Sequence, residues 1–138
     1  MRPSTSLLAE IRDQRSDDKS RPVVSLEVFF EGNDDPASIG CNLPEHPGVP
    51  TFYAVLRSIR ERPDVQDVLV AITEDMGDDD WPFSDCIYVL TRASVKDVEK
   101  WAAALEPDPD PAEGYFPGPP KRAPTLLPEH RVVTLWWD

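Results

Sequence analysis

The order of apolar and polar positions predicts three strands and a helix in the first two thirds of the chain. Residues 23–31 alternate apolar and polar side chains, which is the period of a strand that buries one face. Residues 50–63 carry an apolar stripe at helical spacing and end at a proline, so they predict a helix. Residues 64–74 and 85–91 are apolar at nearly every position, so they predict strands that are buried on both faces.

The remaining pattern predicts a second helix and a last strand. Ser94 is suited to cap a helix that runs to Leu105, because Asp97 follows it at the spacing of a capping box and Pro107 follows the last apolar residue. Residues 131–138 predict the final strand. The resulting order of strand, helix, strand, strand, helix, strand is typical of a ferredoxin-like split β-α-β fold. We therefore expect an α+β protein with a four-stranded antiparallel sheet and two helices on one face.

The domain organisation follows from the same pattern. Residues 1–22 predict an N-terminal arm, with a short helix capped by Ser4, Thr5 or Ser6 that ends near Arg15 before a polar linker. Residues 23–138 predict a single α+β domain, since 138 residues suit one domain. Half of the 16 prolines lie between residues 107 and 128, so a long proline-rich crossover should precede the last strand.

This topology places three long connections at one end of the sheet. They are residues 31–50, 75–84 and 106–130, whereas the connections at the opposite end are short. Long loops on a rigid sheet commonly carry a binding site. We therefore expect these three loops to converge and to form the functional surface.

The three loops combine carboxylates with aromatic side chains, which is typical of a protein interface. The candidate partner-binding residues are Asn33, Asp34, Asp35, His46, Asp79, Asp80, Trp81, Phe83, Tyr115 and Phe116. Their acidity favours a basic protein partner. Because Trp81 lies in a charged loop, we expect its replacement by alanine to weaken a partner and to leave folding largely intact.

The charge of the chain narrows the possible partners. A formal net charge of −12 repels nucleic acid and anionic membranes. The apolar residues near the N-terminus form too short a run for a signal peptide or a membrane span. Cys41 and Cys86 lie far apart and form no CxxC motif, which suits a reducing compartment. We therefore expect a cytoplasmic protein.

A small enzyme, assisted by a divalent metal, is the alternative function. Asp34, Asp35 and Asp85 together with His46 could supply its ligands and a base, but their spacing matches no calcium-binding loop. Cys41 shares a loop with His46, and proximity in sequence alone does not make a catalytic pair. A solvated acidic loop is the default explanation of these residues, so no metal, cofactor or catalytic residue is assigned.

Two stretches, GNDDPASIGCNL and WPFSDCIYVL, resemble small acidic uncharacterised proteins of bacteria. The resemblance extends from about Val23 to Asp138 and implies a bacterial cytoplasm without implying an activity. Immunity proteins that neutralise bacterial toxins are also often small, acidic and single-domain, which is an analogy of class and involves no shared motif.

The second face of the predicted sheet is apolar as well. Two helices cover one face, which leaves side chains such as Leu69 and Ala71 to point the other way. A large apolar patch is unusual on a soluble monomer. The N-terminal arm, the proline-rich crossover or a second copy of the chain could cover it, and a homodimer through this face is the expectation we favour slightly.

Overall fold

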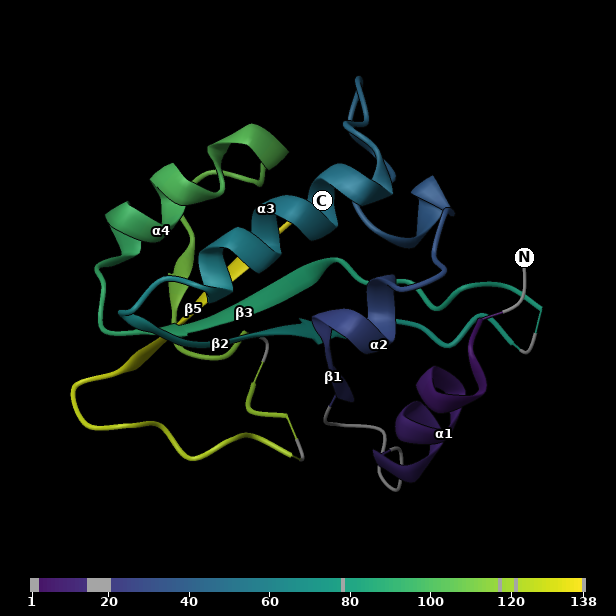
Figure 1. Cartoon of the computed structure of the whole chain (residues 1–138), viewed down its shortest axis with the longest axis horizontal. Helices are drawn as coiled ribbons and strands as arrows, with labels where there is room; N and C mark the ends of the chain where they lie inside the picture. The colour runs from purple at the N-terminus through teal and green to yellow at the C-terminus, as the bar shows by residue number, and fades with distance from the viewer. Residues whose placement is uncertain (1–2, 15–20, 78, 117, 121, 138) are drawn as a thin grey trace.

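Five antiparallel strands form the centre of the computed structural model (Figure 1), which describes residues 3–14, 21–77, 79–116, 118–120 and 122–137. Across the sheet the strands are β1 (Val23–Ser25), β2 (Val65–Ala71), β3 (Cys86–Thr91), β5 (Arg131–Trp136) and β4 (Ala112–Glu113). Each neighbouring pair is antiparallel. The α+β class is therefore confirmed, whereas the sheet has five strands instead of four.

The predicted first strand is much shorter than expected. It ends at Ser25, and the following residues form the helix α2 (Leu26–Phe30). The Ser25 hydroxyl caps this helix by accepting a hydrogen bond from the Val28 backbone N–H at 3.2 Å. Leu26, Phe29 and Phe30 face the core at helical spacing, and only Leu26 and Phe30 also fit the alternation of a strand, which is why the two patterns were hard to separate here.

The strand directions also differ from the ferredoxin-like expectation. That expectation has the first two strands running the same way, because a helix connects them. In the structure β1 pairs directly with β2 in antiparallel register, with Val23 opposite Ala71 and Ser25 opposite Leu69. The α2 helix redirects the chain after β1, so α3 (Val49–Arg60) leads into an antiparallel neighbour. The ferredoxin-like arrangement is therefore not found.

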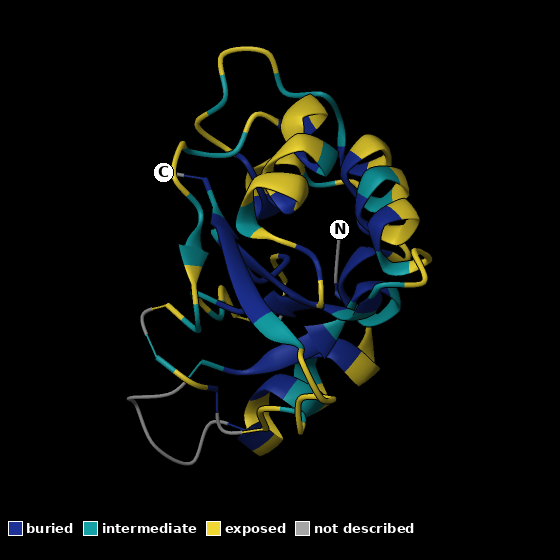
Figure 2. Ribbon diagram, turned by 90° about the vertical axis from the view of Figure 1, so that its left-hand side faces the viewer, coloured by how far each residue is buried: buried dark blue, intermediate teal, exposed yellow. Residues whose placement is uncertain are grey.

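One face of the sheet carries the helices and the larger core. The helices α2, α3 and α4 (Val95–Trp101) pack on this face (Figures 1 and 2), and the 3-10 turn η2 (Ala103–Leu105) continues α4. Ser94 caps α4 as predicted, because its hydroxyl accepts from the Asp97 backbone N–H at 3.1 Å. No helix in the described segments is long and apolar enough to cross a membrane.

The second face of the sheet is covered by the chain itself. Its buried residues are Val23, Leu69, Ala71, Cys86, Tyr88, Leu90 and Val132. Tyr115 and Trp136 pack against them, and the Tyr88 hydroxyl donates to the Phe116 carbonyl at 3.1 Å. The predicted alternation of faces is therefore confirmed, but the exposed patch that motivated a homodimer is already buried within one chain.

The N-terminal arm packs against the domain. The helix α1 (Thr5–Gln14) buries Leu7 and Ile11 completely and lies beside β1 and α2. Its last residue, Gln14, makes two hydrogen bonds to the free edge of β1. The side-chain amide donates to the Val23 carbonyl and accepts from the Val23 N–H, both at 2.8 Å. The predicted helix end at Arg15 and the linker that follows, residues 15–20, lie outside the described residues.

The long connections converge only in part at one end of the sheet. We call the end where β2 stops at Ala71 and β3 begins at Cys86 the loop end. Residues 31–50 and 75–84 meet there, as a bridge between Ile39 and Ser84 shows. The third connection starts there and then crosses to the opposite end, where Gln66 of β2 bonds the backbone of Thr125 and Leu127. This correction follows from β5, which runs antiparallel to β3 and must begin at the far end.

Candidate functional site

An acidic groove lies where the first two loops meet at the loop end. It encloses about 380 Å³ and is lined by Asp35, Ala37, Cys41, Glu74, Met76, Asp80, Trp81 and Phe83. We call this set the acidic groove. Its two sides are held together by backbone hydrogen bonds, since the Ser84 N–H donates to the Ser38 carbonyl at 2.8 Å, and Glu74 and Phe83 pair across a bridge. The groove is therefore attached directly to the sheet.

The first loop is ordered by its own polar side chains. The Asn33 amide nitrogen donates to the Ser38 hydroxyl at 2.9 Å and to the Phe29 carbonyl at 3.3 Å, while its oxygen accepts from the Asp35 N–H. The Asp35 carboxylate then caps the 3-10 turn η1 (Pro36–Ser38) by accepting from the Ala37 N–H at 2.9 Å. These bonds fix the wall of the groove that carries Asp35.

The floor of the groove is formed partly by a buried tryptophan. Trp81 is 3% exposed, and its indole N–H donates to the Phe29 carbonyl at 3.0 Å. This contact ties the second loop to α2 and places Trp81 in the main core. Trp81 is therefore not the exposed aromatic that its charged loop predicts, and its burial removes the reason for expecting Trp81→Ala to leave folding intact. Met76 is the large apolar side chain that the groove exposes, at 48%.

All charged side chains among the described residues that line the groove are negative. Asp35, Glu74 and Asp80 contribute three carboxylates, and no Lys, Arg or His is among the described residues that line it. The net charge of −12 adds to the negative potential. The groove therefore combines an anionic rim with an apolar floor.

The other candidate residues are distributed over different parts of the structure. Asp34 and Asp79 are exposed near the groove without lining it. Tyr115 packs edge-on against Tyr88 at 4.9 Å on the second face of the sheet. Phe116 is 54% exposed and lines a different pocket. The structure thus brings together four of the ten candidates, and the four are Asp35, Asp80, Trp81 and Phe83.

His46 braces the first loop. Its Nδ1 accepts from the Gly48 N–H at 2.9 Å, so its Nε2 carries the proton and donates to the Ile39 carbonyl at 2.7 Å. The ring also lies 5.3 Å from that of Phe52. Because backbone groups occupy both ring nitrogens, His46 is not positioned as a base for the exposed Cys41.

The residues of the metal-assisted alternative are not gathered into one site. Asp85 pairs with Arg21 and Thr73, whereas His46 is engaged by the first loop. Among the described residues no group of three or more His, Cys, Asp or Glu side chains is arranged to hold a metal ion. Asp85 and His46 therefore do not share a site in the described chain.

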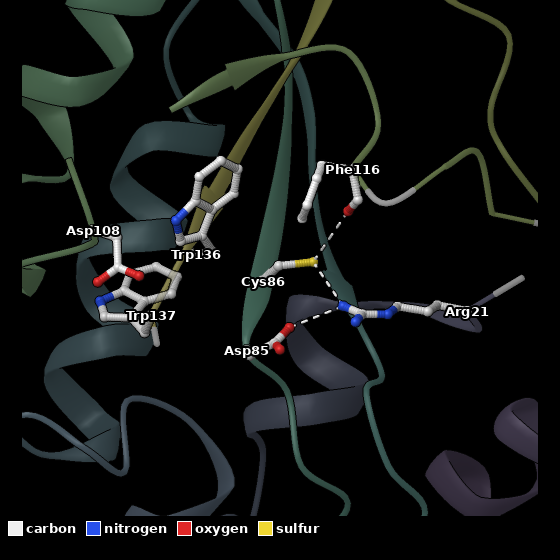
Figure 3. A pocket seen from close by; sticks show the side chains of 7 residues that line it. All are labelled: Arg21, Asp85, Cys86, Asp108, Phe116, Trp136 and Trp137. Carbon is white, nitrogen blue, oxygen red and sulfur yellow. Dashed lines mark hydrogen bonds and ion pairs between the residues drawn. The ribbon is translucent and has the colours of Figure 1, made fainter. Parts of the chain in front are cut away.

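A second pocket, of about 340 Å³ (Figure 3), shares no lining residue with the acidic groove. We call it the Arg21 pocket; it is lined by Arg21, Asp85, Cys86, Asp108, Phe116, Trp136 and Trp137. Arg21 Nη1 donates to Asp85 Oδ1 at 2.9 Å and lies 3.6 Å from Cys86 Sγ. Burial raises the pKa of the Cys86 thiol to about 11, so it remains protonated at neutral pH.

Several residues of these two sites were missed by the sequence-based reasoning. Glu74 and Met76 line the acidic groove, whereas the sequence pattern places Glu74 in a strand and does not distinguish Met76 from the rest of its loop. Arg21 and Trp136 line the Arg21 pocket, whereas the pattern places Arg21 in the linker and Trp136 only on a sheet face. Glu74 lies shortly after Ala71, the last residue of β2. A carboxylate at the end of a strand is therefore the feature of the sequence that could have indicated a site residue here.

The comparisons with known proteins identify one family. The model of the uncharacterized protein YfbO family matches residues 2–135. A curated relative from Escherichia coli (strain K12), named uncharacterized protein YfbO, is 37% identical over 134 residues, which is 91% of this chain and 89% of the relative. No solved structure shows significant similarity to the chain.

Proposed function

The chain belongs to the YfbO family, and we propose that it is a non-enzymatic module that binds a basic protein through the acidic groove. The observation that carries this proposal is the groove itself, in which Asp35, Glu74 and Asp80 stand around an apolar floor. No cation is among the described lining residues, so the carboxylates have no neutralising partner within the groove.

A lysine or arginine side chain matches this arrangement in both of its parts. Its aliphatic stem can pack on the Phe83 and Met76 side chains, while its charged head reaches the carboxylates at the rim. A compact anion would be repelled by the same rim. The groove therefore selects a long cationic side chain presented by a partner.

The loops of the groove are already held in place by hydrogen bonds, so binding a partner should cost little conformational entropy. The Asn33 and Asp35 hydrogen bonds and the bridge from Ile39 to Ser84 hold the loops before a partner arrives. Preformed loops lose less conformational entropy on association than mobile ones. The charge of −12 further favours fast, salt-sensitive encounter with a basic surface.

The class of partner that best suits this surface is a basic protein whose exposed lysine or arginine serves its own activity. An immunity-type inhibitor would act in this way, by occupying the basic residues that a toxin uses. The small size and acidity of the chain support this narrower proposal, which rests on class and not on a shared motif. A single copy of the chain is sufficient to bind such a partner.

The experiment compares two variants with equal changes in net charge. Asp35→Asn/Glu74→Gln/Asp80→Asn neutralises the groove, and Glu61→Gln/Glu99→Gln/Glu129→Gln neutralises three exposed carboxylates elsewhere. The probe is a fluorescein-labelled tetra-arginine peptide, with the tetra-citrulline peptide as its neutral counterpart, and binding is measured by fluorescence anisotropy.

The proposal expects the groove variant to bind tetra-arginine at least about tenfold more weakly, since each desolvated charge pair contributes on the order of 1 kcal/mol or more. The control variant should lose less than about threefold, because exposed charges act mainly through screened long-range attraction. Equal losses in the two variants would show a diffuse acidic surface in place of a specific groove.

A further inference from the structure

The Arg21 pocket combines one ion pair with an apolar wall of aromatic rings and a thiol. We propose that it binds a small neutral ligand that carries a carboxamide group on an aromatic ring. None of the residues that form the acidic groove lines this pocket. The binding of a basic partner and the binding of this ligand can therefore be tested separately, and either can fail while the other stands.

The polar end of the pocket is the ion pair between Arg21 and Asp85 (Figure 3). Arg21 Nη1 donates to Asp85 Oδ1 at 2.9 Å and lies 3.6 Å from Cys86 Sγ. Among the described residues, the two side chains bond to the protein through Nη1 and Oδ1, so Arg21 Nη2 and Asp85 Oδ2 remain as a donor and an acceptor. The two side chains are 27% and 33% exposed, so a ligand can reach them.

Asp85 holds the guanidinium of Arg21 in place. Its Oδ1 also accepts from the Thr73 hydroxyl at 2.9 Å, and its backbone N–H donates to the same hydroxyl at 3.0 Å. The Asp85 carbonyl accepts from the Trp137 N–H at 2.9 Å. Arg21 is thus oriented by a side chain that is itself fixed at several points, which is the arrangement expected of a preorganised binding group.

The pairing of the two charges favours a neutral ligand. A carboxylate would compete with Asp85 for Arg21, and an ammonium group would compete with Arg21 for Asp85. A primary carboxamide avoids both costs, because its carbonyl oxygen accepts from the guanidinium while its N–H donates to the carboxylate. Asp108 also lines the pocket, but it already has an interaction within the protein and is given no part in binding the ligand.

The ring of the ligand is assigned to the space over Cys86. Cys86 of β3 pairs across the sheet with Trp136 of β5, and its Sγ lies 3.6 Å from Arg21 Nη1. In Figure 3 Cys86 correspondingly lies between Trp136 and Arg21. One residue therefore separates the ion pair from the Trp136 ring. An aromatic ring bonded directly to a carboxamide can cover this short distance, and it has no second charged group to reach.

The wall around this space is apolar and uncharged. The Phe116 and Trp136 rings lie 5.1 Å apart and are tilted by 44°, and Phe116 is 54% exposed. A third ring can pack against such a pair in an offset or edge-on geometry. Because burial raises the pKa of the Cys86 thiol to about 11, the surface under the ring carries no charge. The volume of about 340 Å³ is near the lower limit for ligand pockets, which indicates a small ligand.

The first test uses the unmodified protein, benzamide and three analogues that each lack one feature of it. Acetophenone has a methyl group in place of the amide nitrogen, and benzoate has a second oxygen there and a negative charge. Cyclohexanecarboxamide keeps the amide and lacks the aromatic ring. NMR titration of the Cys86 amide and the Trp136 indole N–H measures affinity and location together.

We expect benzamide to bind with a dissociation constant on the order of 1 mM, as suits a ligand of this size. It should bind at least about threefold more tightly than each analogue, because each analogue loses a hydrogen bond to a charged group or the aromatic contact. Equal or tighter binding of any analogue, or no shift of these two resonances with benzamide, would overturn the assignment.

The second test uses two pocket variants with matched controls. Arg21→Met keeps an apolar stem and removes the donors, and Phe116→Ala removes one ring of the wall. Each should weaken benzamide binding at least about threefold. The controls should leave binding unchanged: Arg131→Met removes a cation that pairs with Glu113 at the other end of β5, and Leu127→Ala removes another exposed apolar side chain.

A pocket variant that binds benzamide as tightly as its control would overturn the assignment. Should Arg21→Met fail to fold, Phe116→Ala and the analogue series on the unmodified protein still decide, since Phe116 is largely exposed.

Discussion

At the scale of single residues, Trp81 connects the acidic groove to the core. Its ring forms part of the groove floor, and its indole N–H donates to the Phe29 carbonyl, which also accepts from Asn33. One carbonyl of α2 therefore fixes both loops of the groove. A change at Trp81 should consequently affect stability and the shape of the groove together.

The first prediction separates the packing of Trp81 from its hydrogen bond. Trp81→Ala should lower the free energy of unfolding by about 3–5 kcal/mol, because it leaves a cavity in a well-packed site. Trp81→Phe should cost about 1–3 kcal/mol, since it retains much of the ring but leaves the Phe29 carbonyl with one donor fewer. Urea unfolding measures both. As a control, Phe116→Ala should change stability by less than about 1 kcal/mol because Phe116 is 54% exposed. Equal stability of Trp81→Ala and the unmodified protein would place Trp81 outside the core.

At the scale of elements, an ion pair joins two helices that the sequence separates widely. Glu27 of α2 accepts two hydrogen bonds from the Arg60 guanidinium at the end of α3. This bidentate contact lowers the pKa of Glu27 from an ordinary value of 4.5 to about 2, despite partial burial that opposes the shift. It helps to fix α2, whose Phe29 carbonyl positions the groove loops.

The second prediction concerns the pH dependence of stability. Because the Glu27 pKa is lower in the folded state, its contribution is present above about pH 4.5 and is lost as the pH falls towards about 2. The free energy of unfolding of Glu27→Gln should therefore change less with pH between about pH 2 and pH 4.5 than that of the unmodified protein. At neutral pH it should cost about 0.5–1 kcal/mol, since the carboxylate is 40% exposed. Thermal unfolding from pH 2 to pH 7 measures the difference, with Glu99→Gln as the control. An unchanged slope in Glu27→Gln would contradict the assignment.

The third prediction tests how α1 is attached to the sheet. Gln14 and Gln66 each use both side-chain amide atoms to pair with backbone groups, but the Gln14 contacts are buried and the Gln66 contacts are exposed. Gln14→Leu should cost about 1–3 kcal/mol, because it leaves the outer edge of Val23 unpaired, whereas Gln66→Leu should cost much less. Hydrogen exchange at the Val23 amide should accelerate in Gln14→Leu alone. Similar effects of the two substitutions would show that burial of this edge contributes little.

The sequence predicts the faces of the central strands well and their directions poorly. Strand periodicity separates Val68 and Val70 from Leu69 because each side chain simply points up or down. Direction depends on tertiary contacts, and the α2 helix that reverses the chain was hidden because Leu26 and Phe30 fit both periods. The two residues of β4 carry no pattern long enough to recognise.

The site could be predicted only as far as the loops could be placed. Asp35 and Asp80 were found because the connections that carry them meet at the loop end, which the element order anticipated. Trp81 was misjudged because a position in a charged loop does not reveal which way a side chain turns. Met76 was missed because a methionine in a loop does not reveal from the sequence that its side chain is exposed, as this one is at 48%.

At the scale of the whole molecule, a single chain covers both faces of its sheet. The helices bury one face, and the segment around Tyr115 and Phe116 contributes to the cover of the other, where Tyr88 and Leu90 have no exposed surface. A second copy is therefore not required to bury an apolar patch. The exposed surface that remains near the groove is largely acidic.

The fourth prediction follows for the oligomeric state. The protein should sediment as a monomer of 15.5 kDa at micromolar concentration, because the face expected to pair two chains is already buried. Its charge of −12 adds repulsion between copies at low salt. A stable dimer in sedimentation equilibrium would show that another surface pairs the chains.

The most direct test of the central claim is a map of where a single cationic side chain binds. Backbone amide resonances are followed by NMR during titration with N-acetyl-arginine amide, and with the citrulline analogue as the neutral control. The proposed function expects chemical-shift changes at Asp35, Glu74 and Asp80, which disappear at high salt and are absent with citrulline. Shifts spread evenly over all exposed carboxylates, or equal shifts with citrulline, would contradict the acidic groove as the binding site.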